Sequence, residues 1–196
     1  MERSIILKAH EVRGILNGNQ TQLRRVVKPQ PDHQSRDGIT SEWCWKRTDR
    51  QEQARSVGFE SDDTSILNQF SPFGQVGDRL WGKETYHYDE ESEFVFYRAG
   101  GCYEFDKGSG GWTPSTVMPR NLSRILLEIV SVRVERLQDI SADDCRAQGA
   151  PCDDTWDASV LRHAFFQRWD RDHGKGAHAN SPFLWVVEFK RVTTDE

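Results

Sequence analysis

The chain has 196 residues, with 26 Lys and Arg against 31 Asp and Glu, so its formal net charge at pH 7 is −5. Hydrophobic residues make up 36% and include seven Trp and ten Phe, large side chains that exclude wholesale disorder because each buries much area. No apolar run approaches the roughly 18 to 20 residues that cross a bilayer, and the opening MERSIILKAHEVRG lacks the pattern of a signal peptide. We therefore expect one domain, residues 1–196, in the cytoplasm, with no membrane partner.

The first block predicts a strand, a helix and a second strand. Residues 4–7 form a short apolar run, and the next segment places Val12, Ile15 and Leu16 on one helical face before Gly18, a natural C-cap. The second strand, QTQLRRVV, is stopped by two prolines. Residues 1–30 hold six basic and two acidic residues on an otherwise acidic chain. This excess of positive charge lines a basic cleft or lies on a solvated basic edge.

Residues 32–69 are polar and read as a mobile insertion in which WCWKR is one short strand. A strand is then expected from Arg79 to Tyr86, another in EFVFYRAG, and a hairpin turn at GSGG, residues 108–111. RILLEIVSVRVERLQ is the strongest strand signal and predicts a bend near Ser131. One face of that strand is expected to carry Leu126, Glu128, Val130, Val132 and Val134.

A helical elaboration is predicted at 141–172. Ser141 is the expected N-cap of a short helix. A second helix is expected from about Asp157 to Asp170. Its buried face should carry Val160, Leu161, Ala164, Phe165 and Trp169. FLWVVEFKRV closes the chain as a buried strand. The fold class expected is α+β, a small mixed β-barrel with flanking helices.

The cysteines and histidines do not predict a metal site. Cys44, Cys102, Cys145 and Cys152 contain no CxxC pair and are expected to be free thiols. The alternative, zinc on Cys145, Cys152 and histidines, has the wrong spacing for a zinc finger. His163, His173 and His178 are expected on the surface or in a loop. We expect no metal and no cofactor.

Polar residues at element junctions are the candidate site. Thr21, Arg24 and Arg25 follow the first helix. Trp81 and Lys83 share one strand face, as in sites that stack a base and neutralise its phosphate, while Glu84 faces the other way. Glu128 needs a partner among its apolar neighbours. It is paired with an arginine such as Arg25, acts as a general acid/base, or accepts a hydrogen bond from a nucleobase.

Four segments carry a resemblance: the strand–helix–GxxTxxRR opening, GQVGDRLWGKETY, STVMPRNLSRILLEIVSVRVERLQDIS and NSPFLWVVEFKRV. In this order they resemble the ASCH branch of the PUA-like superfamily, and more narrowly the ASCH-like proteins of tailed phages and prophages. The resemblance covers about three-quarters of the chain. It implies a β-barrel with a cleft beside the first helix, associated with binding RNA or modified nucleobases.

The resemblance also assigns possible catalytic positions. Members that deacetylate acetylated cytidine use a Lys, a Thr and a Glu, and the matching positions here are Gln20, Leu23 and Glu128. The wider family signature is Gly-x-Lys-x-x-Glu-x-Arg, and of its four fixed residues this chain keeps only Gly18 and Arg25. Gln20 cannot act as a base and Leu23 has no hydroxyl. We therefore do not expect this chain to share the amidohydrolase activity of those members.

The resulting hypothesis is a binding module for nucleic acid, a nucleotide or a modified base, of phage or prophage origin and acting in the host bacterial cytoplasm. Its ligand is expected to be RNA, single-stranded nucleic acid or a modified nucleoside. The expected binding residues are Gln20, Arg24, Arg25, Trp81, Lys83 and Glu84. One alternative is a small amidohydrolase or ribonuclease that uses Glu128 or Glu84 with Thr21. Another is a protein that binds a host protein through its acidic body and the tryptophans of the insertion.

Overall fold

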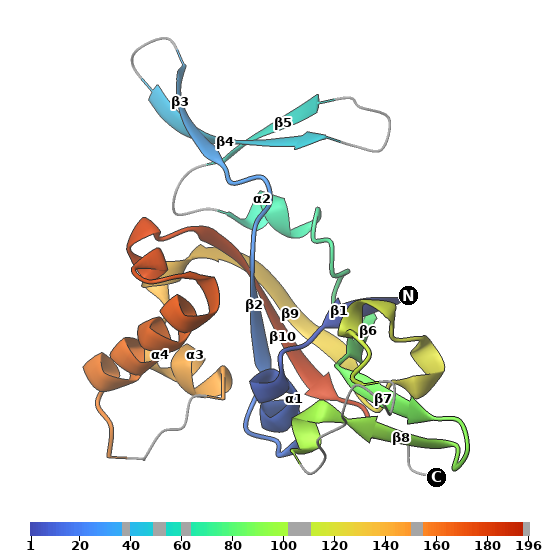
Figure 1. Cartoon of the computed structure of the whole chain (residues 1–196). Coiled ribbons are helices and arrows are strands. Elements are labelled where there is room, and N and C mark those ends of the chain that lie inside the picture. Colours follow the sequence, from blue (N-terminus) through green and yellow to red (C-terminus); the bar gives the residue numbers. More distant parts are fainter. Residues whose placement is uncertain (37–39, 49–53, 60–63, 102–110, 150–154, 194–196) are drawn as a thin grey trace.

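The described residues of the computed structural model form ten strands and four α-helices, joined by turns and short 3₁₀ segments (Figure 1). The structure describes residues 1–36, 40–48, 54–59, 64–101, 111–149 and 155–193. The strands are β1 Glu2–Ile6, β2 Gln22–Val26, β3 Asp32–Arg36, β4 Thr40–Thr48, β5 Ala54–Phe59, β6 Arg79–Lys83, β7 Tyr86–Asp89, β8 Phe94–Tyr97, β9 Leu126–Arg136 and β10 Phe183–Arg191. The α-helices are α1 Ala9–Leu16, α2 Ser65–Asn68, α3 Ala142–Ala147 and α4 Ala158–His173.

A five-stranded sheet in the order β1-β6-β9-β10-β2 organises the molecule. β1 runs parallel to β6, and the other neighbours are antiparallel. The apolar face of α1, with Val12 and Ile15, packs on Leu23, Leu80 and Leu127 of this sheet. The mixed α+β class is thus confirmed, with α1 on one side of the sheet and α3 and α4 beyond β2 (Figure 1).

The expectation of a barrel is wrong, because β1 and β2 are the two edges of the sheet and do not pair with each other. Side chains take the place of a closing ladder. Gln20 Nε2 donates to the Gln22 carbonyl at 3.0 Å, and Arg25 Nη1 donates to the Arg24 carbonyl at 2.9 Å. Arg25 Nη2 also donates to the carbonyl of Ile6, at the end of β1. Two carbonyls at the open edge of β2 are thereby satisfied without a neighbouring strand. We call the gap between β1 and β2 the seam.

The longest strand contains a bulge that reverses its predicted face. Glu188 pairs with Ser131 and Phe189 pairs with Ile129, so Val130 has no partner on β10. A bulged residue shifts the alternation of side chains. Leu127 and Ile129 are buried in the core, whereas Val130 is exposed. The predicted irregularity near Ser131 is confirmed, but the predicted face is wrong before the bulge.

Glu128 therefore does not lie on the apolar face. Its carboxylate forms an ion pair with Lys190 Nζ at 2.8 Å across the β9–β10 pair. Arg25, its expected partner, is bound to Glu11 instead. The segment from Arg79 to Tyr86 is also two strands rather than one, because β6 ends at Lys83 and β7 begins at Tyr86 to pair with β8.

The insertion is a sheet rather than a single short strand. β3, β4 and β5 form an antiparallel three-stranded sheet above the main one (Figure 1). Trp45 on β4 is buried, with its ring centroid 6.0 Å from that of Trp185 on β10. Its indole N–H donates to the Pro29 carbonyl at 2.9 Å. Trp45 thus attaches the insertion to the main core instead of presenting its ring to a partner protein.

The two predicted helices near the C-terminus are confirmed. Ser141 accepts a hydrogen bond from the Asp144 amide, and Asp157 caps α4 in the same way. Leu161, Phe165 and Trp169 are buried, but Val160 is exposed, contrary to expectation. Cys145 is a free thiol buried against α4, and burial raises its pKa to about 11. Cys102, Cys152 and the first three residues of GSGG, 108–110, lie outside the described residues.

Among the described residues, no helix combines the length and apolar character needed to cross a membrane.

Candidate nucleic-acid interface

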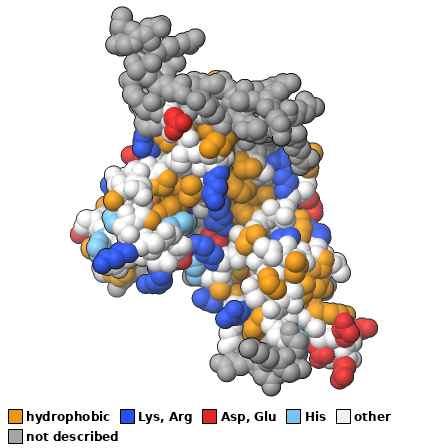
Figure 2. Space-filling view, turned by 45° about the horizontal axis from the view of Figure 1, so that its top comes forward, with side chains coloured by type: hydrophobic (Ala, Val, Ile, Leu, Met, Phe, Trp, Pro, Cys, Tyr) orange, Lys and Arg blue, Asp and Glu red, His pale blue; other side chains and the backbone are white. Residues whose placement is uncertain are grey.

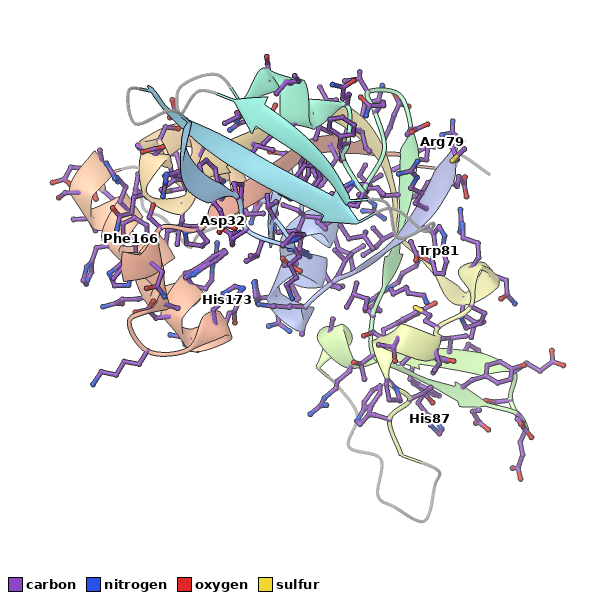
Figure 3. All side chains as sticks on the ribbon, turned by 90° about the horizontal axis from the view of Figure 1, so that it is seen from above. Asp32, Arg79, Trp81, His87, Phe166 and His173 are labelled. Atoms are coloured by element: carbon purple, nitrogen blue, oxygen red, sulfur yellow. The ribbon has the colours of Figure 1, made fainter. Side chains whose placement is uncertain are left out.

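A pocket of about 230 Å³ opens at the seam, between the start of α1 and the C-terminal half of α4. Ile6 at the end of β1 and Arg24, Arg25 and Val26 on β2 form its floor. Figure 3 shows His173 reaching from α4 toward α1 across this space. We call it the seam pocket.

Four cationic side chains line the seam pocket, together with two carboxylates. Arg25 makes a bidentate ion pair with Glu11, in which Nη1 and Nη2 lie 2.7 and 2.9 Å from the two carboxylate oxygens. Lys8 Nζ lies 2.7 Å from Asp172 on α4 and so bridges the pocket mouth. Opposite charges therefore fix Lys8 and Arg25 in place, which is the condition for a preorganised polar site.

The other two cations have unused binding capacity. Arg24, with a side chain only 1% exposed, is bound to Gln22 and Glu135, yet its buried Nε has no hydrogen-bond partner. A buried donor without an acceptor costs about 1–3 kcal/mol. Arg168 donates to the carbonyls of Gln148 and Gly149, and among the described residues no carboxylate contacts it. Burial lowers the pKa of Arg168, but an arginine side chain stays charged in proteins. An anion in this pocket would give Arg168 a counter-charge, whereas the charge of Arg24 is already met by Glu135 and Asp144.

An aromatic pair forms the outer wall. The His173 ring stacks on Trp169 with a centroid separation of 3.8 Å and an interplanar angle of 18°. Trp169 is buried, whereas His173 is exposed and lines the pocket. Burial lowers the pKa of His173, opposed by a hydrogen bond with the Trp169 carbonyl. An exposed imidazole that stacks on Trp169 with one ring face turns its other face away from that ring, a surface on which a base can stack.

Gln20 lies at the back of the seam pocket, fixed between two glycines. A Cβ at Gly14 would lie 2.9 Å from the Gln20 side chain, and one at Gly149 would lie 3.1 Å from it. Because any larger residue at either position would displace it, the amide has one orientation, set by its bond to Gln22. Of the residues expected at the site, the seam pocket contains Gln20, Arg24 and Arg25.

The remaining expected residues lie elsewhere. Trp81 and Lys83 do share a face, with Lys83 Nζ 5.3 Å from the Trp81 ring, but Trp81 lies near β1 and β6, on the other side of α1 from His173 (Figure 3). Glu84 is buried and forms a bidentate ion pair with Arg124. Thr21 lines a separate pocket, which neither Glu84 nor Glu128 reaches. The structure therefore does not bring together the residues that the hydrolase alternative needs.

Sequence reasoning missed Lys8, Arg168, Trp169 and His173, which come from two helices about 160 positions apart in the chain. One signal was present for the α4 members. Arg168 and Asp172 are four residues apart, as are Trp169 and His173, so each pair shares a helical face. Nothing in the sequence showed that this face meets α1. Among the described residues, no group of three or more His, Cys, Asp or Glu side chains is placed to hold a metal ion.

Beyond the pocket, an ionic network joins α3 to the sheet. Asp144 accepts hydrogen bonds from Gln22 and Arg133, both at 2.7 Å, and lies 3.4 Å from Arg24. Burial acts to raise the pKa of Asp144, but the Gln22 hydrogen bond and the charge of Arg24, with Ser141 and Arg133, outweigh it and lower the pKa to about 2. The carboxylate therefore stabilises the fold in its charged form.

This shift predicts an acid-dependent loss of stability. A carboxyl whose pKa falls from its usual 3.8 to about 2 on folding stabilises the protein above pH 4, and the contribution disappears as the pH falls toward 2. We expect the free energy of unfolding of the native protein to exceed that of Asp144→Asn by about 2 kcal/mol at pH 6 and by roughly 1 kcal/mol at pH 3. Urea unfolding followed by tryptophan fluorescence measures both. An equal difference at the two pH values would contradict the role given to Asp144.

The chain is thus a mixed α+β protein with an open five-stranded sheet and a cationic pocket at its unpaired edges. No family model matches the sequence, and no curated protein matches it. Among solved structures it is similar to the ASCH domain from Lactobacillus crispatus JV V101, at 11% sequence identity and a TM-score of 0.38. The similarity covers 97% of this chain and 79% of that one. It is too distant to establish family membership or function.

Proposed function

We propose that the seam pocket binds a phosphorylated nucleotide unit, either free or within single-stranded nucleic acid. The observation that carries this proposal is the Arg168 guanidinium, which no carboxylate contacts among the described residues, beside the His173–Trp169 stack and with the unpartnered Nε of Arg24 in the same lining. Phosphate neutralisation next to an aromatic face is how proteins hold single strands. The pocket volume suits one nucleotide better than a duplex.

Two further considerations support a binding module. Glu84 and Glu128, the carboxylates considered for catalysis, are both held in ion pairs away from the seam pocket. The sequence resemblance to ASCH-like proteins of phages and prophages favours the same class of ligand, RNA or a modified base, and a place in the bacterial cytoplasm. Arg168 and the Nε of Arg24 bind phosphate in this proposal, Arg25 adds positive charge while it stays paired with Glu11, and Gln20 reads a polar edge of the base.

The test is binding of a fluorescently labelled ten-nucleotide single strand, RNA and DNA separately, measured by anisotropy at several salt concentrations. We expect Arg168→Gln to lower affinity at least about tenfold and to reduce the salt slope by about 0.7, the value for one phosphate contact on a single strand. His173→Ala should lower affinity by a similar factor through loss of stacking. The matched controls on α4 are Arg171→Gln and His163→Ala, because neither residue lines the seam pocket.

Trp81→Ala decides between the two aromatic–cation sites. If Trp81→Ala abolishes binding and the Arg168 and His173 variants bind normally, the ligand sits near β6 and the seam-pocket proposal is wrong. A native protein that binds neither strand, nor free nucleotides, at low salt would also overturn it. Urea unfolding of each variant shows whether a loss of binding reflects a loss of fold.

A further inference from the structure

We infer that the seam continues into a second nucleotide subsite, so that the preferred ligand is a single strand of at least two nucleotides rather than a mononucleotide. This inference rests on the proposed function of the seam pocket. Its basis is a second pocket of about 600 Å³ between the main sheet and the insertion. Its lining includes Arg3, Lys28, Trp45, Phe70, Phe73 and Trp185.

The two pockets are contiguous. Val26 on β2 lines both of them. Along β1, Arg3 borders the second pocket and Ile6 borders the seam pocket; along β2 and its extension, Arg24 borders the seam pocket and Lys28 the second. β1 and β2 therefore run antiparallel along the two sides of the seam, and each passes both pockets. Figure 2 shows Lys and Arg side chains in a row down this face, with hydrophobic side chains on both sides.

The spacing fits consecutive nucleotides. Lys28 is two residues beyond Val26, at most about 7 Å along the backbone, a distance that one phosphodiester link can bridge. Lys28 is exposed and lines the second pocket, and among the described residues it takes part in no ion pair. It is therefore placed to neutralise a phosphate that leaves the seam pocket.

The walls of the second pocket fit a base. Phe70 and Phe73 are half-buried, so part of each ring faces the pocket. Trp45 and Trp185 close its inner side, where the Trp45 ring packs against Phe70 at 6.0 Å. Arg3 Nη1 donates to the Pro72 carbonyl at 2.9 Å and so fixes the segment that carries Phe70 and Phe73. Aromatic surface beside two cations, with no carboxylate among the described residues of the lining, favours an anionic aromatic ligand over a cationic peptide.

The experiment compares AMP with the 5′-phosphorylated dinucleotide pApA by isothermal titration calorimetry on the full chain. We expect pApA to bind at least about tenfold more tightly than AMP, through one added base contact. Lys28→Gln and Phe70→Leu should remove most of that gain and leave AMP affinity unchanged. Arg79→Gln is the matched charge control, because Arg79 is exposed and lines neither pocket.

The outcomes separate the two proposals. If AMP binds and His173→Ala weakens it, but pApA binds no more tightly than AMP, the second subsite does not exist and the seam pocket stands. A gain for pApA that survives both Lys28→Gln and Phe70→Leu overturns the second subsite as well. If neither AMP nor pApA binds, the proposed function fails first. Phe70→Leu keeps an apolar side chain at a half-buried position, and Lys28→Gln changes an exposed residue, so both variants should fold.

Discussion

Arg124→Met is expected to lower the free energy of unfolding by about 3 kcal/mol, because it leaves a buried carboxylate without its counter-charge. Glu84 is only 3% exposed, and both of its oxygens accept hydrogen bonds from Arg124, at 2.8 and 2.9 Å. The guanidinium also covers the Tyr97 ring at 4.0 Å. In the variant, Glu84 must take up a proton or admit water.

A double variant makes this prediction specific. Replacing both partners with apolar residues of similar size removes the charge that would otherwise be stranded. We therefore expect Arg124→Met with Glu84→Met to recover most of the stability lost by Arg124→Met alone. Urea unfolding of the native protein, the two single variants and the double variant completes the cycle. A double variant as unstable as Arg124→Met would show that the loss comes from packing on Tyr97 rather than from Glu84.

Arg133→Met is expected to cost a similar amount, about 3 kcal/mol, by removing the cation that three carboxylates share. Arg133 lies 3.0 Å from Glu135 and 2.7 Å from Asp144, and it also donates to Glu188. Burial acts to lower the pKa of Arg133, but the hydrogen bonds to Glu188 and Glu135 outweigh it and raise the pKa. Without Arg133, Glu135 and Asp144 keep only Arg24 as a cation among the described residues, and Glu188 keeps only a hydrogen bond from Gln22.

The control is Arg146→Met on α3. Arg146 pairs with Asp143 at 2.9 Å, but the Asp143 side chain is 96% exposed, and such surface pairs contribute at most about 1 kcal/mol. Equal effects of the two substitutions would mean that the network does not stabilise the contact between α3 and the sheet. Because its carboxylates lose charge in acid, Arg133→Met should also lose less stability than the native protein between pH 6 and pH 3.

The sequence was sufficient to predict most elements, because their signals are local. Ser141 before two aspartates marks a helix start, and the alternating apolar residues of 126–136 mark a strand. It was insufficient for the bulge at Val130, since a bulge is set by the register with β10 and not by the strand alone. That one extra residue explains why Glu128 was expected in the core.

The candidate site was predicted in part for the same reason. Arg24, Arg25 and Gln20 are close in sequence and follow the first helix, so their proximity could be inferred. Arg168 and His173 enter the site only because α4 packs beside β2, through contacts such as that between Arg24 and the Phe165 ring at 5.8 Å. Trp81 and Lys83 were correctly placed on one face, but the fold turns that face away from the seam.

The side chains that replace a strand ladder at the seam have an evolutionary consequence. Gln20 and Arg25 bind two carbonyls at the open edge of β2 through their side chains, while the backbone of Arg25 pairs with Trp185 on β10. Substitutions at these two positions can therefore alter the width and polarity of the opening while every strand keeps its neighbour. Selection can act on the polarity of this opening through side chains, whereas a closed barrel would fill the same edge with backbone pairing, and a change at Arg25 must also supply a counter-charge for the buried Glu11.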